Sequence, residues 1–156
     1  MMRRDTREAL RPFAVAFWPF AAAVALLLLV RLPVEAQRRE WPRAHILDAI
    51  RQVESSGRLF PPDGDGGRAI GPYQIHYAYW LDAVASEPSI GGDYQDCRDL
   101  VYAERVVAAY MRRWALAAWT RGDAETIARV HNGGPRGARI EATRPYWDRV
   151  RRHLPR

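Results

Sequence analysis

The sequence predicts an α+β domain that is mainly α-helical and carries one small Gly-rich β-hairpin or turn. The chain has 156 residues, which is the size of a single domain even if an N-terminal leader is removed. Apolar residues recur at helical spacing in several segments after residue 40. Residues 58–71, by contrast, carry a Pro- and Gly-rich pattern that is incompatible with a helix. Together these observations favour a helical core with one irregular or β element.

The first 36 residues have the pattern of a targeting segment. Four arginines precede an apolar run over 13–30, and Val34-Glu35-Ala36 follows as a candidate cleavage site. The run is longer than the roughly 7–15 apolar residues of a cleaved leader and close to the ~18 of a spanning helix. We therefore expect residues 1–36 to be a signal peptide, with an uncleaved signal anchor as the alternative. A short linker is expected at 37–45 and the folded domain at 46–156, secreted or periplasmic, or anchored to the membrane.

A first helix is predicted from Pro42, because proline fits the first turn of a helix. Its apolar face would consist of Ile46, Leu47, Ile50 and Val53. Ser55-Ser56-Gly57 supplies a stop, which places Glu54 in the last turn.

A tight turn or small hairpin is expected over 58–71, where Pro61-Pro62 and Asp63-Gly64-Asp65-Gly66-Gly67 exclude a helix. Helical patterning resumes near Gln74 and continues to Ser86, before a break at Gly91-Gly92. The inward positions of this second helix would be Ile75, Tyr79, Trp80 and Ala83.

The longest helix is predicted from Asp99 to Trp119. Its apolar stripe would consist of Leu100, Val107, Tyr110, Met111, Trp114 and Ala118. Asp123 can cap a further helix that ends at His131-Asn132-Gly133-Gly134-Pro135. A terminal helical segment is expected around Tyr146 to His153.

Charge and cysteine content narrow the function classes. The formal net charge is +6, and all 24 basic residues are Arg, because the sequence contains no Lys. A basic surface suits nucleic acid, anionic lipid or an acidic cell wall, but no helix-turn-helix, zinc-finger or RNA-binding signature is present, so nucleic acid is not expected as a partner. Cys97 is the only cysteine, which excludes an intrachain disulfide. We expect a buried apolar filler at Cys97, with an intermolecular bridge as the alternative.

No metal and no cofactor is expected. Four scattered histidines and one cysteine lack the ligand spacing of a zinc site. Asp63-Gly64-Asp65-Gly66 hints at a calcium loop but lacks the later acidic ligand of an EF-hand. No phosphate-binding glycine loop is present.

Glu54 and Asp65 form the constellation that best suits catalysis. Cleavage of a glycosidic bond uses one carboxyl that donates a proton to the leaving oxygen and a second that stays ionised. The carbonyl end of the helix and the apolar neighbours Ile50 and Val53 should favour the neutral form of Glu54. The open, glycine-rich turn should favour the anion at Asp65. Glu54 is thus the candidate general acid and Asp65 the candidate second carboxylate.

The motifs around these acids resemble those of the invertebrate-type lysozyme and destabilase family. They are Val53-Glu54-Ser55-Ser56-Gly57, Asp65, Gly71-Pro72-Tyr73-Gln74-Ile75, Tyr79-Trp80-Leu81-Asp82, Tyr110-Met111-Arg112-Arg113, Ala128-Arg129-Val130-His131-Asn132-Gly133-Gly134-Pro135 and Tyr146-Trp147. The resemblance covers about Ile46 to Val150, and it implies a lysozyme-like fold. It also implies hydrolysis of the β-1,4 bond between the amino sugars of peptidoglycan with retention, using Glu54 and an Asp in the turn. The turn differs in length from the family pattern, so Asp63 stays as the alternative to Asp65.

The resemblance further implies where substrate binds. Tyr73 and Gln74 would line a glycan cleft, whereas His131 and Asn132 would either contact the glycan or only end their helix. The animal members are rich in disulfides, so a chain with Cys97 alone is similar to a bacterial-type relative.

Some family members are credited with isopeptidase activity through a Ser and Lys pair. We discount that activity here because the chain has no Lys, although Ser55 or Ser56 with a histidine stays open.

The predicted function is therefore that of a lysozyme acting on peptidoglycan or a related amino-sugar polysaccharide. One alternative is a lytic transglycosylase, which uses the same Glu but lets the sugar's own groups replace the Asp. The other is a catalytically inactive module that binds the cell wall.

Overall fold

The structure, a computed structural model, describes residues 40–156. The targeting segment predicted at 1–36 lies outside the described residues, so its interpretation as a signal peptide or signal anchor stays a prediction. Within 40–156 no helix has both the length and the apolar character needed to cross a membrane.

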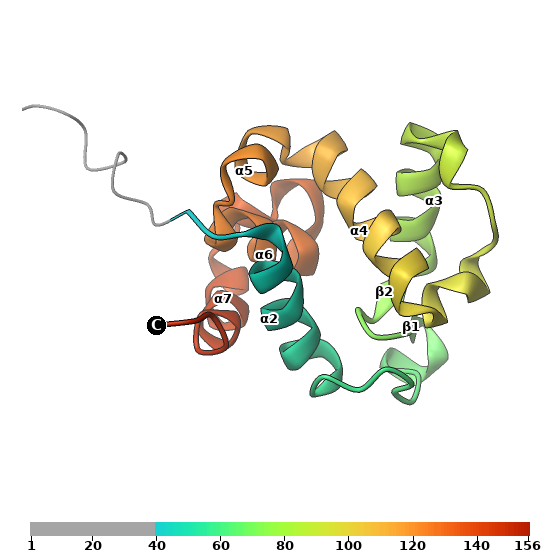
Figure 1. Ribbon diagram of the computed structural model, residues 1–156, viewed down its shortest axis with the longest axis horizontal. Helices are drawn as coiled ribbons and strands as arrows, with labels where there is room; N and C mark the ends of the chain where they lie inside the picture. The colour runs from blue at the N-terminus through green and yellow to red at the C-terminus, as the bar shows by residue number, and fades with distance from the viewer. Residues whose placement is uncertain (1–39) are drawn as a thin grey trace, which may run out of the picture. The chain divides into compact units, whose positions relative to one another are not determined.

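Short helices make up most of the described chain, and one two-stranded sheet interrupts them (Figure 1). In chain order the elements are α2 (Arg43–Ser55), η2 (Asp65–Gly67), β1 (Ala69–Ile70), β2 (Ile75–His76), α3 (Tyr77–Ser86), η3 (Pro88–Ile90), η4 (Tyr94–Arg98), α4 (Leu100–Trp114), α5 (Leu116–Arg121), α6 (Ala124–Gly133), η5 (Gly134–Arg139), η6 (Glu141–Thr143) and α7 (Arg144–Val150). The elements written η are 3₁₀ helices. Figure 1 shows α3 and α4 side by side with the hairpin near them, and α2, α6 and α7 grouped together. This is the mainly helical α+β architecture that the sequence predicts.

Helix α2 begins and ends where the local sequence indicates. Pro42 is its N-cap residue, and the helix therefore starts inside the 37–45 segment expected as a linker. The chain is already docked at Trp41, whose backbone N–H donates to the Gly122 carbonyl at 3.0 Å. At the other end Ser56 adopts a left-handed conformation (φ 52°) that terminates the helix. Glu54 therefore lies in the last turn, as predicted.

The hairpin extends further along the chain than the sequence pattern indicates. Ile70 pairs with Ile75, and Ala69 pairs with His76, in an antiparallel arrangement. The prediction of a helix from Gln74 is wrong at its start, because α3 begins only at Tyr77. The reason is the tight turn at Gly71–Gln74, which brings Ile75 back against Ile70 so that both side chains are buried.

The 3₁₀ helix η4 holds the hairpin and the preceding loop in place. The Tyr94 hydroxyl lies 2.8 Å from the carbonyl oxygens of both Arg68 and Ile75, to either of which it donates. Arg98 binds the Asp63 carboxylate with two guanidinium nitrogens. Cys97, between them, is fully buried, and burial raises the pKa of its thiol to about 12. The prediction of a buried apolar role for Cys97 is confirmed.

The helix predicted from Asp99 to Trp119 is in fact two helices. The chain leaves helical geometry at Ala115 (φ −143°, ψ 36°), which separates α4 from α5. Asp82 of α3 accepts a hydrogen bond from the Trp114 indole and pairs with Arg113, so the end of α4 is tied to α3. Trp114 is 41% exposed and does not belong to the buried stripe. No Gly or Pro marks this break locally.

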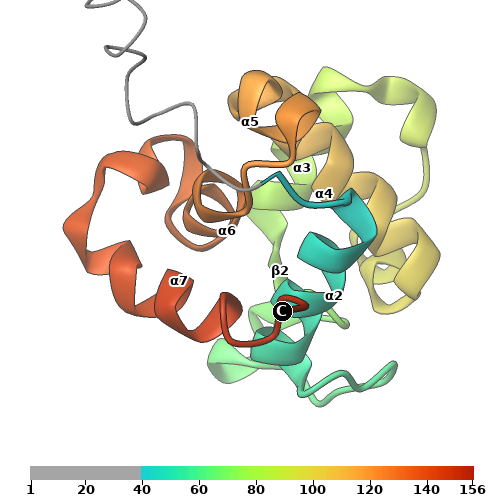
Figure 2. The ribbon, with the colours of Figure 1, turned by 60° about the vertical axis from the view of Figure 1, so that its left-hand side comes forward.

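Helix α6 lies within the core and contacts α2, α4, α5 and α7 (Figure 2). Asp123 caps it by accepting from the Thr126 backbone N–H at 3.2 Å, as predicted. Each guanidinium nitrogen of the buried Arg129 of α6 donates a hydrogen bond: to Glu125 at 3.0 Å, to Thr143 at 2.9 Å and to the Ile140 carbonyl at 3.0 Å. A buried guanidinium is tolerated when its N–H groups are paired in this way. The contacts of Arg129 fix the η5–η6 segment and hence the start of α7.

The close approach of Gly71 to η4 gives a stability prediction. A Cβ at Gly71 (φ 72°) would lie 1.9 Å from the Cys97 carbonyl oxygen, whereas one at Gly66 (φ 65°) would meet nothing within 4 Å. We expect Gly66→Ala to lower the free energy of unfolding by about 1 kcal/mol from backbone strain alone. Gly71→Ala adds a steric clash and should cost about 3 kcal/mol. Urea unfolding of both variants measures this difference, and equal losses would contradict the packing of η4 on the hairpin.

Candidate functional site

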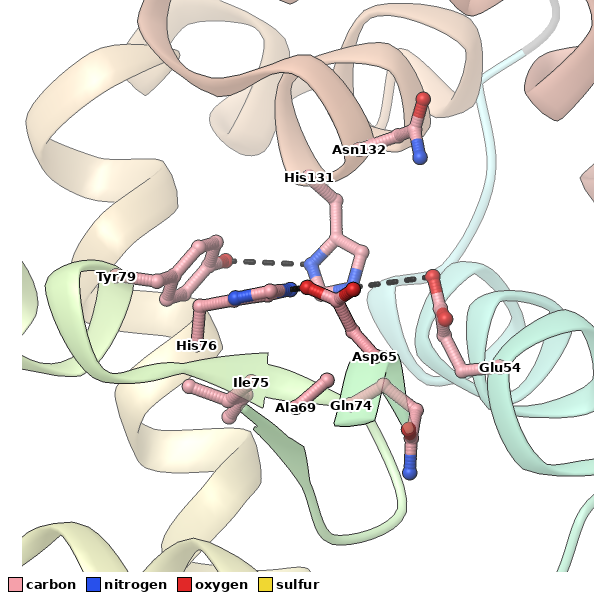
Figure 3. A pocket seen from close by; sticks show the side chains of 9 residues that line it. All are labelled: Glu54, Asp65, Ala69, Gln74, Ile75, His76, Tyr79, His131 and Asn132. Atoms are coloured by element: carbon pink, nitrogen blue, oxygen red, sulfur yellow. Dashed lines mark hydrogen bonds and ion pairs between the residues drawn. The ribbon is translucent and has the colours of Figure 1, made fainter. Parts of the chain in front are cut away.

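A cleft of about 290 Å³ opens where α2, the hairpin region, α3 and α6 meet (Figure 3). It is lined by Glu54, Asp65, Ala69, Gln74, Ile75, His76, Tyr79, His131 and Asn132. Both acids predicted from the sequence therefore reach the same cavity, Glu54 from the end of α2 and Asp65 from η2. A concave site with a few convergent polar groups is the usual form of a ligand-binding or active site.

Glu54 is held by one hydrogen bond from a distant helix. The Tyr146 hydroxyl of α7 donates to Glu54 Oε1 at 2.6 Å, and the Glu54 side chain is only 19% exposed. His131 Nε2 lies 3.7 Å from the same oxygen. The carboxyl is thus fixed at the edge of the cleft, with part of it open to a ligand.

His131 is an almost fully buried member of the cleft wall, with 5% of its side chain exposed. Its Nδ1 shares a hydrogen bond with the Tyr79 hydroxyl at 3.3 Å (Figure 3). Burial lowers the pKa of His131, and the nearby Glu54 charge and a hydrogen bond with the Tyr73 backbone only partly oppose this effect. His131 is therefore a neutral imidazole at neutral pH.

Two tyrosine hydroxyls bind polar groups of the cleft: Tyr146 contacts Glu54, and Tyr79 contacts His131. Burial raises the pKa of Tyr146 well above its usual range, and the Glu54 charge adds to the shift. Burial likewise raises the pKa of Tyr79, whose ring stacks on Tyr110 with 3.6 Å between centroids. Both phenols therefore stay protonated and available as hydrogen-bond donors.

The structure separates the two acids of the glycine-rich turn. Asp65 has a left-handed backbone (φ 49°) and a side chain that is 46% exposed, and it faces the cleft. Arg68 Nη2 lies 2.7 Å from Asp65 Oδ1, and His76 Nε2 lies 3.7 Å from Oδ2. Asp63 does not line the cleft. Its carboxylate is engaged by Arg98, and that hydrogen-bonded pair lowers the pKa of Asp63.

Of the four residues predicted to contact substrate, three line the cleft and one does not. His131 and Asn132 line the cleft. Gln74 also lines it, but its amide donates to the carbonyls of Gly71 at 3.0 Å and Pro62 at 3.3 Å, so the donor is used to shape the turn. Tyr73, the fourth, is not among the residues that line the cleft. Tyr73 is fully buried, and its hydroxyl donates to Glu104 at 3.0 Å, outside the cleft.

Ser55 does not offer a free nucleophile. Its side chain is buried, and its hydroxyl lies 3.0 Å from the Arg51 carbonyl and 3.2 Å from that of Arg58. The hydroxyl thus bonds to the backbone at the end of α2, which does not support the seryl isopeptidase left open for Ser55. In the described part of the chain there is also no cluster of three or more His, Cys, Asp or Glu side chains suited to a metal ion.

Sequence reasoning missed Tyr146 and His76 as neighbours of the two acids. Tyr146 lies 92 positions after Glu54, so no local pattern connects them. His76 is exposed, and the hairpin places it beside Asp65 in the cleft. Predicting a strand at Ile75–His76 would have revealed the position of His76, because neighbouring residues of a strand point to opposite faces. Ile75 is buried in the core, and His76 is exposed on the cleft side.

The fold and the cleft together define a lysozyme-like domain with two acids at one site. The destabilase family model matches residues 44–153. Lysozyme 1 of Crassostrea virginica is 44% identical over 106 residues, which cover 67% of this chain and 55% of that protein. A lysozyme of Meretrix lusoria is 38% identical over 68% of this chain and 85% of its own length. The crystal structure of Tapes japonica lysozyme superposes with a TM-score of 0.57 at 31% identity, over 68% of this chain and 85% of that chain.

The chain belongs to the invertebrate-type lysozyme and destabilase family. It spans only about half the length of the Crassostrea relative (55%). The family membership predicted from the motifs is confirmed.

The buried His131 gives a prediction about pH and stability. The lowered pKa means that the folded state binds a proton less readily than the unfolded chain, whose histidine titrates near 6.5. The stability associated with neutral His131 is therefore complete above pH 6.5 and is lost as the pH falls below it. The wild-type free energy of unfolding should fall by at most about 1.4 kcal/mol per pH unit from this group.

Urea unfolding between pH 7.5 and pH 5 checks this expectation. His131→Gln should show a shallower decline with falling pH than the wild type. His153→Gln removes an exposed histidine and serves as the control, with a slope like that of the wild type. The same slope in all three proteins would contradict a buried neutral His131.

Proposed function

We propose that this domain is a lysozyme that hydrolyses the β-1,4 bonds between the amino sugars of peptidoglycan. The observation that carries the proposal is that Glu54 and Asp65, from separate elements, line the same cleft. Membership of a family whose relatives are named lysozymes supports it. A pair of carboxyl groups at one cleft is the arrangement that most glycoside hydrolases use.

The environments of the two acids suit different roles. Glu54 is mostly buried and held by the Tyr146 hydroxyl, which suits a general acid that donates a proton to the leaving glycosidic oxygen. Asp65 is more exposed and lies beside the Arg68 guanidinium and His76. This position suits a carboxylate that attacks or stabilises the oxocarbenium-like sugar. His131 and Asn132 would contact the glycan from α6.

The proposed roles predict a clear ranking of variants in a turbidity assay on purified peptidoglycan. Glu54→Gln should lower kcat by at least about 100-fold, because the proton donor is lost. Asp65→Asn should also lose most activity. Asp63→Asn is the matched control, since it changes an acid of the same turn that lies outside the cleft, and it should retain most of the wild-type kcat. Full activity of Glu54→Gln, or loss only in Asp63→Asn, would overturn the assignment.

Mass spectrometry of the digested peptidoglycan identifies the reaction in the same experiment. Hydrolysis gives reducing sugar ends, and products with only anhydro-sugar ends would mean a lytic transglycosylase instead. Binding to sacculi without any lysis would mean an inactive wall-binding module.

We also propose that the domain acts outside the cytoplasm, either secreted, periplasmic or anchored to the membrane. Two considerations support this. The peptidoglycan substrate lies outside the cytoplasmic membrane, and residues 1–36 have the composition of a signal peptide or signal anchor.

A further inference from the structure

We propose that Tyr146 is a positioning residue whose hydroxyl holds Oε1 of Glu54 and leaves Oε2 to carry the proton transferred in catalysis. This inference rests on the proposed role of Glu54 as the general acid. It assigns a function to a residue of α7 that lies outside the cleft lining itself.

Both contacts of the Glu54 carboxyl converge on one oxygen. Tyr146 Oη is 2.6 Å from Oε1, and His131 Nε2 is 3.7 Å from the same atom. Within residues 40–156 the hydrogen bond and the close ion contact of the Glu54 carboxyl both reach Oε1, and neither reaches Oε2. The two oxygens of this carboxyl are therefore not equivalent.

The chemistry of the tyrosine determines which oxygen holds the proton. Burial keeps the phenol protonated, so Tyr146 acts on Oε1 as a donor. In a protonated carboxyl the carbonyl oxygen is the better acceptor, and the hydroxyl oxygen carries the proton. A donor fixed on Oε1 therefore favours the tautomer that is protonated on Oε2. That proton can be given to a glycosidic oxygen in the cleft without first breaking the bond to Tyr146.

The tyrosine itself is rigidly held. Tyr146 is 3% exposed, and the Arg149 guanidinium lies 5.3 Å above its ring centroid. The ring also lies 6.5 Å from that of His131, which is in turn fixed by Tyr79. A donor with so little freedom can fix the rotation of the Glu54 carboxyl, which is what a proton donor in a defined geometry needs.

The charged and titratable groups around Glu54 come from α7, α6, α3 and the hairpin region with η2. They are Tyr146 and Arg149 on α7, His131 on α6, Tyr79 on α3, and Asp65 with its partners Arg68 and His76 in the hairpin region. Of these, Tyr146 is the one that donates a hydrogen bond to the carboxyl. Its removal therefore changes the protonation of Glu54 and leaves the other charges in place.

Tyr146→Phe tests the inference, because it removes the hydroxyl and keeps the buried ring. The donor stabilises the ionised carboxylate more than the neutral acid, so without it the carboxyl stays protonated to higher pH. We expect the alkaline limb of the kcat profile to move up by about one pH unit. We also expect kcat at the optimum to fall about 10-fold with little change in KM, because Oε2 is no longer oriented.

Tyr102→Phe is the matched control. Tyr102 is a partly buried tyrosine of α4 whose hydroxyl donates to the Gly91 carbonyl at 2.7 Å, away from the cleft. This variant also loses one tyrosine hydroxyl, and it should leave both the alkaline limb and kcat close to those of the wild type. A loss of kcat in Tyr146→Phe with an unmoved alkaline limb would mean a packing role only and would overturn the inference. An unchanged kcat and limb would overturn it as well.

Carboxyl-carbon NMR of the protein labelled with ¹³C-glutamate provides a readout that does not need activity. The Glu54 signal is identified by its absence in Glu54→Gln. Its titration midpoint should move up by about one pH unit in Tyr146→Phe and stay in place in Tyr102→Phe. If the wild type does not cleave peptidoglycan at any pH, the proposed function fails. The titration still decides whether Tyr146 controls the Glu54 carboxyl, and an unmoved midpoint would overturn that control.

Discussion

The packing of α6 against α2, α4, α5 and α7 is the constraint on which the cleft depends. This helix carries His131 at its C-terminal end and buries Ile127, Ala128 and Val130 among its neighbours. Because α2 and α7 both pack against it, the carboxyl of Glu54 and the hydroxyl of Tyr146 come within 2.6 Å. The site is thus a product of core packing, which fixes helix ends that are far apart in sequence.

A second constraint holds the loop before the hairpin without an intrachain disulfide, since Cys97 is the only cysteine of the sequence. The loop from α2 to the hairpin has few buried side chains of its own, and η4 stabilises it from outside. Arg98 engages Asp63, the Tyr94 hydroxyl donates to one of the two hairpin carbonyls within its reach, and the Cys97 carbonyl packs against Gly71. Hydrogen bonds of this kind hold a loop when they are several and partly shielded from water. They leave Asp65 as the acid of the loop that faces the cleft.

The same two constraints give the cleft an asymmetric electrostatic environment. On the α6 side, buried groups are neutral: His131 has a lowered pKa, and the phenols of Tyr79 and Tyr146 have raised ones. On the hairpin side, Asp65, Arg68 and His76 are exposed to solvent to about half their area or more. A protein can in this way hold two carboxyl groups a short distance apart and still give them different tasks.

Local sequence determined a large part of this molecule. Pro42 and Ser55-Ser56-Gly57 mark the ends of α2, which puts Glu54 in its last turn, and the glycines around Asp65 exclude an α-helix there and leave the short 3₁₀ turn η2. Asp123 begins α6 as a capping residue, and the pattern of apolar residues predicts the mainly helical fold. These features depend on neighbours within a few residues, so they can be read from spacing alone.

Only the tertiary structure decided which of these residues meet. Asp65 lines the cleft and Asp63 does not, because Asp63 is bound by Arg98, which is 35 positions away in the sequence. The residue that donates a hydrogen bond to Glu54 is Tyr146, which is 92 positions away. The break at Ala115 comes directly after the two residues that bind Asp82 of α3, and burial keeps Tyr73 out of the cleft. Such outcomes are set by long-range packing and desolvation. They leave no periodic signal in the chain, because each depends on where a distant side chain comes to lie.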